Sequence, residues 1–297
     1  MNFGQIVTAM IAPFSEDGLL DLQATTTLID HLHHNHTDTL VVNGTTGEAP
    51  VLTADEKKLL LQTTIAHSKG RMNVIAGVGS NNTLQSIELA KEAEALGADG
   101  IMVVVPYYNK PSQEGIYQHM VQVADAVSIP VMLYNVPGRT GVDMSVETTL
   151  RLATHRNVFA IKEASGNMDK VSAIIRQSPP QFSVYSGDDS LTLPMLSLGA
   201  KGVVSVASHI IGTEMKQMIS AFEAGDVKRA ASMQSELFPV MQALFMAPNP
   251  TPVKAALNTF GISCGGVRLP LVPLTELENT ALQSVLSPFV PHSAFAQ

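Results

Sequence analysis

The sequence has few cysteines and few charged residues, and it contains no tryptophan. Its 297 residues include a single cysteine, Cys264, which excludes an intrachain disulfide and a cysteine-rich zinc site. Charged residues make up 15% of the chain and hydrophobic residues 45%. This balance is typical of a folded protein with a large core and excludes a disordered chain.

Other absences narrow the possible partners and location. No run approaches about 18 uninterrupted apolar residues, so we expect no membrane span. The first residues lack a basic start followed by an apolar run, so we expect no secretory signal peptide. The net charge is −8, and without a basic stripe we expect no nucleic acid partner. The composition therefore predicts a cytoplasmic enzyme or small-molecule binder.

Short apolar runs rich in valine and isoleucine recur along much of the chain. They are bounded by Gly, Pro, Asn or Asp, which is typical of strands buried on both faces of a parallel sheet. We predict eight such strands, at Ile6–Phe14, Thr39–Asn43, Asn73–Val78, Gly100–Val105, Pro130–Tyr134, Asn157–Ile161, Phe182–Tyr185 and Gly202–Val206.

Patterns with helical spacing separate these runs. Eight strands that alternate with helices predict an α/β fold, a (β/α)8 TIM barrel. An open, doubly wound sheet is the alternative, but no glycine-rich dinucleotide turn follows the first predicted strand. After about residue 210 only helical patterns remain. We therefore predict a catalytic barrel over residues 1–225 and a small C-terminal helical extension over residues 226–297.

Lys162 lies at the end of the sixth predicted strand, where barrel enzymes place their chemistry. Alternation puts Lys162 on the face opposite Phe159 and Ile161, so it faces the barrel axis if that bulky pair faces the helices. An ammonium group there loses hydration, which favours the free amine, and a free amine can form a Schiff base with a ketone or aldehyde. The alternative is a structural lysine paired with Glu163 or Glu48.

Other polar residues follow neighbouring strand ends. The Tyr134 phenol could shuttle protons near a Schiff base, or it could simply cap the barrel mouth. Thr45 and Thr46 offer hydroxyl and N–H groups to a carboxylate or a proton relay, although a plain turn would use the same residues. Arg139 follows a rigid Pro-Gly turn and could clamp a carboxylate, or it could be an exposed loop arginine.

The histidines at positions 31, 33, 34 and 36 form another cluster that could suggest a metal site. They lie in a segment with helical spacing, away from the strand ends, and no later strand end supplies further ligands. We therefore predict a solvated helix end and no metal site.

The order and sequence of several motifs along the chain resemble those of the family of 4-hydroxy-tetrahydrodipicolinate synthase (dihydrodipicolinate synthase). This family belongs to the superfamily of pyruvate-dependent class I aldolases and N-acetylneuraminate lyase. The motifs are Gly44-Thr45-Thr46-Gly47-Glu48, Pro106-Tyr107-Tyr108-Asn109-Lys110-Pro111, Tyr134-Asn135-Val136-Pro137-Gly138-Arg139-Thr140 and Ile161-Lys162-Glu163-Ala164-Ser165-Gly166. The resemblance extends from about Gly4 to Leu286.

The resemblance implies a lyase of lysine and diaminopimelate biosynthesis that condenses pyruvate with L-aspartate 4-semialdehyde, without a metal or organic cofactor. It implies a homotetramer (a dimer of dimers) or a homodimer, in which Tyr108 enters the site of a neighbouring subunit. The implied catalytic residues are Lys162 as the Schiff-base nucleophile and Tyr134, Thr45 and Tyr108 as the proton relay. The implied substrate contacts are Thr46, Arg139, Gly187 and the backbone around Val204.

Two alternative functions share some of these features. A sister aldolase, such as N-acetylneuraminate lyase or a 2-keto-3-deoxy sugar-acid aldolase, would share Lys162 and Tyr134, because these residues serve pyruvate. Arg139 in its Pro-Gly-Arg-Thr motif favours the synthase. A non-catalytic keto-acid binder would not need a proton relay.

The resemblance also bears on regulation, because some family members are inhibited by lysine at a subunit interface. Lysine-sensitive members tend to have histidine at the positions of Ala54 and Lys57 and glutamate at the position of Gln85. A cation at position 57 and the lack of a carboxylate at position 85 should repel lysine. We expect an enzyme that is insensitive to lysine.

Overall fold

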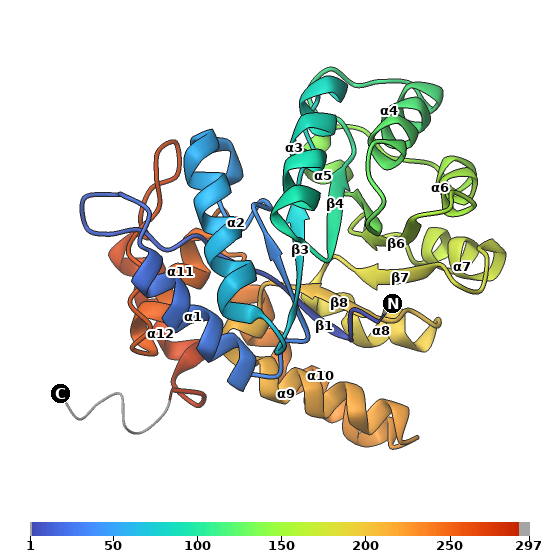
Figure 1. The fold of residues 1–297 in the computed structure, drawn as a ribbon. Helices are drawn as coiled ribbons and strands as arrows, with labels where there is room; N and C mark the ends of the chain where they lie inside the picture. The colour runs from blue at the N-terminus through green and yellow to red at the C-terminus, as the bar shows by residue number, and fades with distance from the viewer. Residues whose placement is uncertain (1, 291–297) are drawn as a thin grey trace.

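Eight parallel strands close into a barrel in the computed structural model, which describes residues 2–290 (Figure 1). The strands are β1 (Ile6–Ala9), β2 (Thr39–Val42), β3 (Asn73–Gly77), β4 (Gly100–Val104), β5 (Val131–Asn135), β6 (Val158–Glu163), β7 (Ser183–Ser186) and β8 (Gly202–Ser205). They pair in chain order, and β8 also pairs with β1. The predicted (β/α)8 barrel is confirmed, and the open sheet is excluded because no strand of this sheet is left at an edge.

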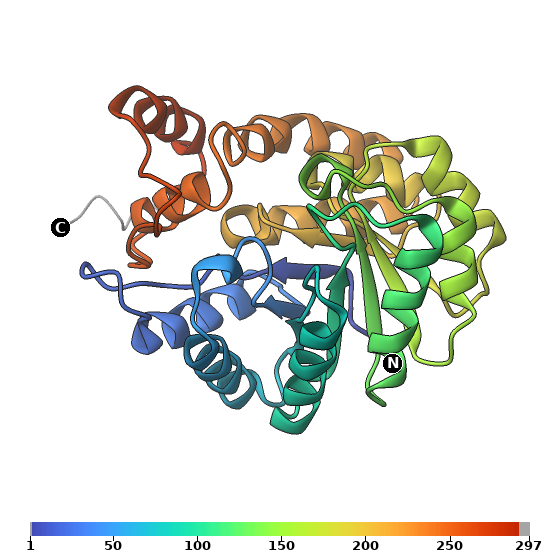
Figure 2. The ribbon, with the colours of Figure 1, turned by 90° about the horizontal axis from the view of Figure 1, so that it is seen from above.

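Helices follow the strands and cover the outside of the barrel (Figures 1 and 2). They are α1 (Leu22–His34), α2 (Ala54–Ser68), α3 (Thr83–Leu96), α4 (Gln113–Asp125), α5 (Pro137–Thr140), α6 (Val146–Ala153), α7 (Met168–Gln177), α8 (Thr192–Ser197) and α9 (Ser208–Glu223), with short 3-10 turns η1 (Ala49–Val51) and η2 (Asp189–Leu191).

Local sequence determines where several of these helices begin or end. Thr53 and Glu56 form a reciprocal capping box at the start of α2. Gly97, with φ of 90°, ends α3 in the left-handed conformation that glycine adopts without strain.

Alternating strand residues build two apolar layers. One layer lies between strands and helices and includes Ile161, while the other fills the barrel interior and includes Ala160. The prediction for Phe159 is wrong. A register shift pairs Val131 with Val158 but the next residue of β5 with Ala160. This bulge moves Phe159 off the helix-facing side, and its ring stacks on Phe3 with 4.6 Å between centroids.

Three further helices follow the barrel: α10 (Val227–Ala243), α11 (Thr251–Thr259) and α12 (Glu276–Leu286). Helix α10 packs against α9, and α12 packs against both α10 and α11. Figure 2 shows the C-terminal segments beside the loop that follows β1, where the Phe14 N–H donates to the Cys264 carbonyl at 3.0 Å. The predicted extension over residues 226–297 contains these helices, while residues 291–297 lie outside the described part. The boundary after residue 225 stays a prediction.

The histidine cluster is only partly solvated. His34 and His36 are exposed, but the His31 ring donates to the His209 carbonyl at 2.7 Å, and burial lowers the pKa of His31. The prediction of a solvated helix end is therefore wrong for His31. Between residues 2 and 290, no group of three or more histidine, cysteine or acidic side chains is placed to hold a metal ion. Within the same range, no helix combines the length and apolar character needed to cross a bilayer.

Candidate active site

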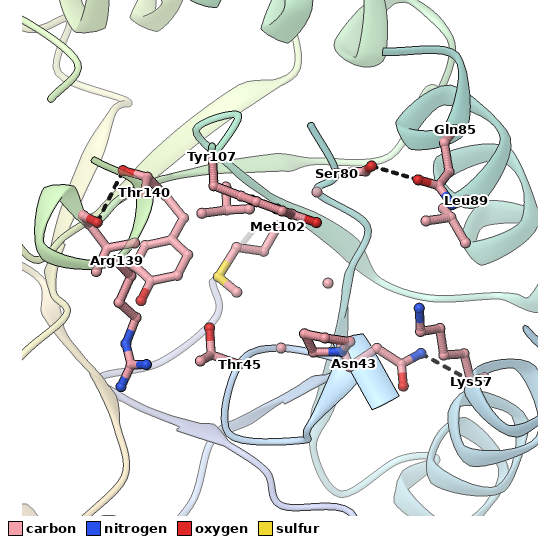
Figure 3. A pocket seen from close by; sticks show the side chains of 18 residues that line it. Asn43, Thr45, Lys57, Ser80, Gln85, Leu89, Met102, Tyr107, Arg139 and Thr140 are labelled. Atoms are coloured by element: carbon pink, nitrogen blue, oxygen red, sulfur yellow. Dashed lines mark hydrogen bonds between the residues drawn. The ribbon is translucent and has the colours of Figure 1, made fainter. Parts of the chain in front are cut away.

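A cavity of about 480 Å³ opens at the carboxyl ends of strands β2 to β5 (Figure 3). Three residues predicted for the site line it: Thr45 after β2, Tyr134 in β5 and Arg139 in α5. The other lining residues are Asn43, Gly44, Ala49, Pro50, Lys57, Gly77, Gly79, Ser80, Gln85, Leu89, Met102, Val104, Tyr107, Val136 and Thr140. Parallel strands bring these residues together because their carboxyl ends all meet at one mouth of the barrel.

The cavity is a positive environment. Its lining includes the cations Lys57 and Arg139 and, among the residues that the structure describes, no carboxylate. Burial lowers the pKa of the Lys57 amine. Arg139 extends from a tight turn in which the Arg139 N–H donates to the Val136 carbonyl at 2.9 Å. A lining of this kind suits substrates that carry carboxylates.

Lys162 lies in β6 directly beside Tyr134. The two residues are ladder partners, and the Lys162 amine lies 4.3 Å from the centroid of the Tyr134 ring. Both side chains are buried, at 6% and 5% exposure. The alternative of a structural ion pair with Glu163 or Glu48 is wrong, because none of the ion pairs within residues 2–290 involves Lys162.

The two carboxylates that could have neutralised Lys162 contact other lysines. Glu48 lies 2.7 Å from the amine of Lys254, and Glu163 lies 3.7 Å from the amine of Lys170. The Lys162 amine therefore lies beside an aromatic ring and, among residues 2–290, has no acid partner. An amine in this setting can act as a nucleophile.

Two more of the predicted residues belong to the next two strands of the barrel or directly follow them, although neither lines the cavity. Gly187 directly follows β7 and lies close to the end of β6. A Cβ atom at this position would lie 3.1 Å from the Lys162 Cγ and 2.6 Å from the Ala164 Cβ. Val204 belongs to β8, where it is buried in the interior layer together with Tyr134. The barrel thus brings together predicted residues from its fifth, sixth, seventh and eighth strands.

Thr46 and Tyr108 are placed differently from Thr45. Thr46 is buried at 3% exposure, whereas Thr45 is exposed. Tyr108 is 88% exposed, has φ of 73° and does not line the cavity, whereas its neighbour Tyr107 does. Within one chain, the structure therefore does not bring Tyr108 to Lys162.

The residues that directly follow Tyr134 and Lys162 form contacts that the sequence pattern did not indicate. These residues, Asn135 and Glu163, are ladder partners and point to the helix side of the strands, since side chains alternate. The Asn135 amide donates to both Glu163 carboxylate oxygens at 3.1 Å. This contact ties the ends of β5 and β6 to each other, at the level of the paired tyrosine and lysine.

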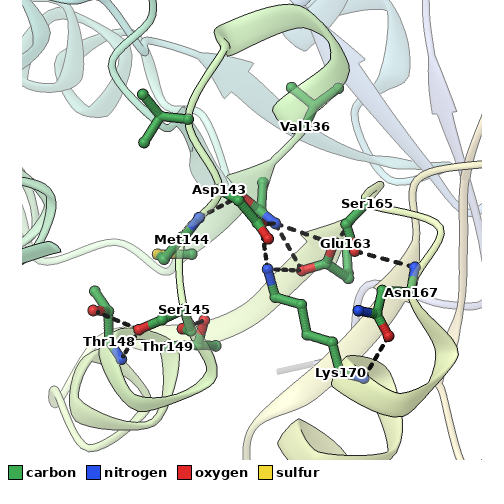
Figure 4. Close-up of polar contacts among 12 residues, drawn as sticks. Val136, Asp143, Met144, Ser145, Thr148, Thr149, Glu163, Ser165, Asn167 and Lys170 are labelled. Atoms are coloured by element: carbon green, nitrogen blue, oxygen red, sulfur yellow. Dashed lines mark hydrogen bonds and ion pairs between the residues drawn. The ribbon is translucent and has the colours of Figure 1, made fainter. Parts of the chain in front are cut away.

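A lysine from the next helix completes this polar cluster (Figure 4). Lys170 of α7 contacts Asp143 and lies 3.7 Å from Glu163, and the Asn135 amide also donates to Asp143 at 2.8 Å. The Glu163 carboxylate further accepts the Ser165 N–H at 2.7 Å. Polar residues at the end of otherwise apolar strands were the signal in the sequence, but their partners come from loops and helices that the sequence did not place.

Comparisons with known proteins agree with this architecture. The sequence profile of the Dihydrodipicolinate synthetase family matches residues 2–288. A protein named 4-hydroxy-tetrahydrodipicolinate synthase 1, from Halalkalibacterium halodurans, is 58% identical over 97% of this chain and 98% of its own length. The crystal structure of a dihydrodipicolinate synthase from Bacillus anthracis superposes with a TM-score of 0.96 at 52% identity, over 97% of this chain and 98% of that one.

A more distant structure is relevant to assembly. It is described as a monomeric dihydrodipicolinate synthase variant, and it is 39% identical with a TM-score of 0.93, over 96% of each chain. The family profile and the 58% identity both extend over nearly the whole chain. The chain therefore belongs to the dihydrodipicolinate synthetase family.

Proposed function

We propose that this chain condenses pyruvate with L-aspartate 4-semialdehyde to give 4-hydroxy-tetrahydrodipicolinate, through a Schiff base on Lys162. The observation that carries this proposal is the buried Lys162 amine, which lies 4.3 Å from the Tyr134 ring centroid and has no acid partner among the described residues. The adjoining cavity offers the Arg139 guanidinium to substrates that both carry carboxylates. The name of the relative at 58% identity supports the same activity.

The proposed reaction begins when the Lys162 amine attacks the ketone carbon of pyruvate. Loss of water gives an imine, and loss of a methyl proton converts the imine to an enamine. The enamine carbon attacks the aldehyde carbon of the semialdehyde and forms the new carbon–carbon bond. The amine of the semialdehyde then adds to the imine carbon, which closes the ring and releases Lys162.

Each step moves a proton, and the centroid of the Tyr134 ring lies 4.3 Å from the Lys162 amine. We assign the relay to Tyr134, Thr45 and a Tyr108 from a neighbouring subunit. Thr45 is exposed in the cavity lining. Tyr108 is 88% exposed, so its side chain is available to contact a second copy of the chain. The proposed enzyme is therefore at least a homodimer, and a homotetramer built as a dimer of dimers is the larger alternative.

The remaining predicted residues have roles in substrate binding in this proposal. Arg139 binds the semialdehyde carboxylate, since it extends from a tight turn at the cavity and its guanidinium can form two parallel hydrogen bonds. Thr46 and the backbone around Val204 hold pyruvate, and Gly187 contacts the intermediate. We place the enzyme in the cytoplasm, as the composition predicts, with no nucleic acid or membrane as partner.

Borohydride trapping tests the chemistry directly. Protein reduced in the presence of pyruvate should gain one stable adduct, which peptide mass spectrometry should locate on Lys162. The adduct should be absent in Lys162→Ala and kept in Lys201→Ala, a control at an exposed lysine. A folded wild-type protein that gains no adduct would exclude the mechanism.

The choice of second substrate needs its own assay. Turnover of pyruvate with L-aspartate 4-semialdehyde is the expected result. Cleavage of sialic acid or of 2-keto-3-deoxygluconate instead would identify a sister aldolase, an alternative that the name of the 58%-identical relative does not favour.

A further inference from the structure

The buried Thr46 hydroxyl is held by a residue far away in the chain. The Asn249 side-chain amide, in the loop between α10 and α11, donates to the Thr46 Oγ1 at 2.9 Å across a separation of 203 residues. Thr46 and Asn249 are both buried, at 3% and 7% exposure. The C-terminal part of the chain thereby reaches the turn that carries Thr45.

The direction of this hydrogen bond determines what Thr46 can do. An amide nitrogen can only donate, so the Thr46 oxygen acts as the acceptor and keeps its own hydrogen for another partner. No acceptor within residues 2–290 takes that hydrogen. A carboxylate can only accept, so a threonine in this state matches the carboxylate of a keto acid.

Asn249 is not satisfied as a purely structural residue would be. Its side-chain oxygen is buried and has no hydrogen-bond partner among residues 2–290. An unpaired buried oxygen lowers stability, and most buried amides in folded proteins are paired at both ends. The contact with Thr46 gives a reason for keeping an asparagine at this position.

The same turn is fixed a second time, two residues further on. The Glu48 carboxylate lies 2.7 Å from the amine of Lys254 in α11 and accepts the backbone N–H of Arg268 at 2.9 Å. The side chains of Glu48 and Lys254 are 1% and 2% exposed. These contacts join the turn to the C-terminal segment a second time, and we expect them to help keep Asn249 aligned on Thr46.

We propose that Asn249 is a positioning residue that holds Thr46 as a hydrogen-bond donor for the carboxylate of pyruvate. In this view, the C-terminal extension, which we take to begin at residue 226, is part of the substrate-binding apparatus. The inference rests on the proposed function, because it requires that Thr46 faces a bound keto acid.

The variants Asn249→Ala and Asn249→Asp test this role, with titration calorimetry of pyruvate and the rate of the borohydride-trapped adduct as readouts. The alanine removes the donor, and the aspartate replaces it with an acceptor that captures the Thr46 hydrogen. We expect the pyruvate concentration for half-saturation to rise roughly tenfold in Asn249→Ala and further in Asn249→Asp. Asn279→Asp, the same change at an exposed position of α12, should leave it unchanged.

A double-mutant cycle separates positioning from general damage. In a Thr46→Val background, Asn249→Ala should have no further effect on pyruvate binding, because the hydroxyl it directs is gone. Equal losses in both backgrounds, or no loss in the single variant, would overturn the inference. If Asn249→Asp fails to fold, the cycle built on Asn249→Ala still tests the inference.

A wild-type protein that binds no pyruvate would overturn the proposed function and this inference together. Normal adduct formation in Asn249→Ala would overturn the inference alone.

Discussion

The Lys162 amine lies 4.3 Å from the centroid of the Tyr134 ring because the two residues are direct partners in the ladder between β5 and β6. Neither side chain needs a loop to bring it to the other. The distance between the proposed nucleophile and the tyrosine ring is therefore a property of the barrel itself, and changes that disturb the ends of these two strands should disturb the proposed chemistry.

Gly187→Ala should displace Lys162, the proposed nucleophile. The added methyl group would lie 3.1 Å from the Lys162 Cγ and 2.6 Å from the Ala164 Cβ, so the lysine stem or the strand end must move. Overpacking of this kind costs about 1–3 kcal/mol. We expect the rate of borohydride-trapped adduct formation to fall roughly tenfold or more, since small misplacements of a reacting group have large effects. Gly266→Ala is the control, because a Cβ atom there meets nothing within 4 Å. Equal rates in the two variants would contradict the prediction.

Glu163→Gln should weaken the cluster that joins β5 and β6. Glu163 is buried and lies 3.7 Å from the Lys170 amine, so its loss leaves that buried cation with Asp143 alone. We expect the free energy of unfolding, measured with urea, to fall by about 1–3 kcal/mol, and kcat to fall with it.

An exposed ion pair supplies the matched control for this change. Glu92 lies 3.7 Å from Lys58, the same distance, but both side chains are more than 40% exposed. Exposed pairs contribute about 0–1 kcal/mol, so Glu92→Gln should change little. A smaller loss in Glu163→Gln than in Glu92→Gln would show that the buried cluster does not support the strand ends.

Stability should fall as the pH drops from about 6.5 toward 4 because of His209. Burial lowers the pKa of His209 to about 4, against an ordinary value of 6.5. Its Nε2 accepts the Ile11 N–H at 3.3 Å, and its Nδ1 donates to the Val206 carbonyl at 2.8 Å, so the folded protein holds the neutral ring.

The unfolded chain thus binds the extra proton first, so the contribution of His209 is fully present above pH 6.5 and is lost as the pH falls toward 4. The loss is up to about 3 kcal/mol. Urea titrations of His209→Gln should show a flatter pH dependence over this window. Replacement of the exposed His34 by glutamine should leave the dependence of the wild type, and a His209 variant that keeps the same slope would contradict the assignment.

Millimolar lysine should not inhibit the enzyme. Lys57 lines the cavity as a cation, and the Gln85 side-chain oxygen already accepts the Ser80 hydroxyl at 2.6 Å. An incoming ammonium would thus meet a positive charge and, among the lining residues between positions 2 and 290, no carboxylate. Steady-state rates with and without lysine should agree, and calorimetry should detect no lysine binding. Inhibition at millimolar lysine would contradict this prediction.

Much of the fold and part of the site follow from the sequence alone. Strands buried on both faces read as short apolar runs, and the eight predicted runs overlap the eight strands of the barrel. Lys162 could be identified from the sequence because a lysine at the end of a buried strand is uncommon unless it has a charged partner or a function. Its neighbour Tyr134 followed from the same logic, since parallel strands align their ends.

Only the tertiary structure decided which polar groups pair with each other. Glu48 and Glu163 both could have neutralised Lys162, but each meets another lysine. Thr46 meets Asn249 across 203 residues. Local patterns report burial and secondary structure, because these depend on neighbours along the chain. The choice of a distant partner depends on how loops and the C-terminal helices pack against the barrel. The spacing of apolar residues along the sequence does not contain this information.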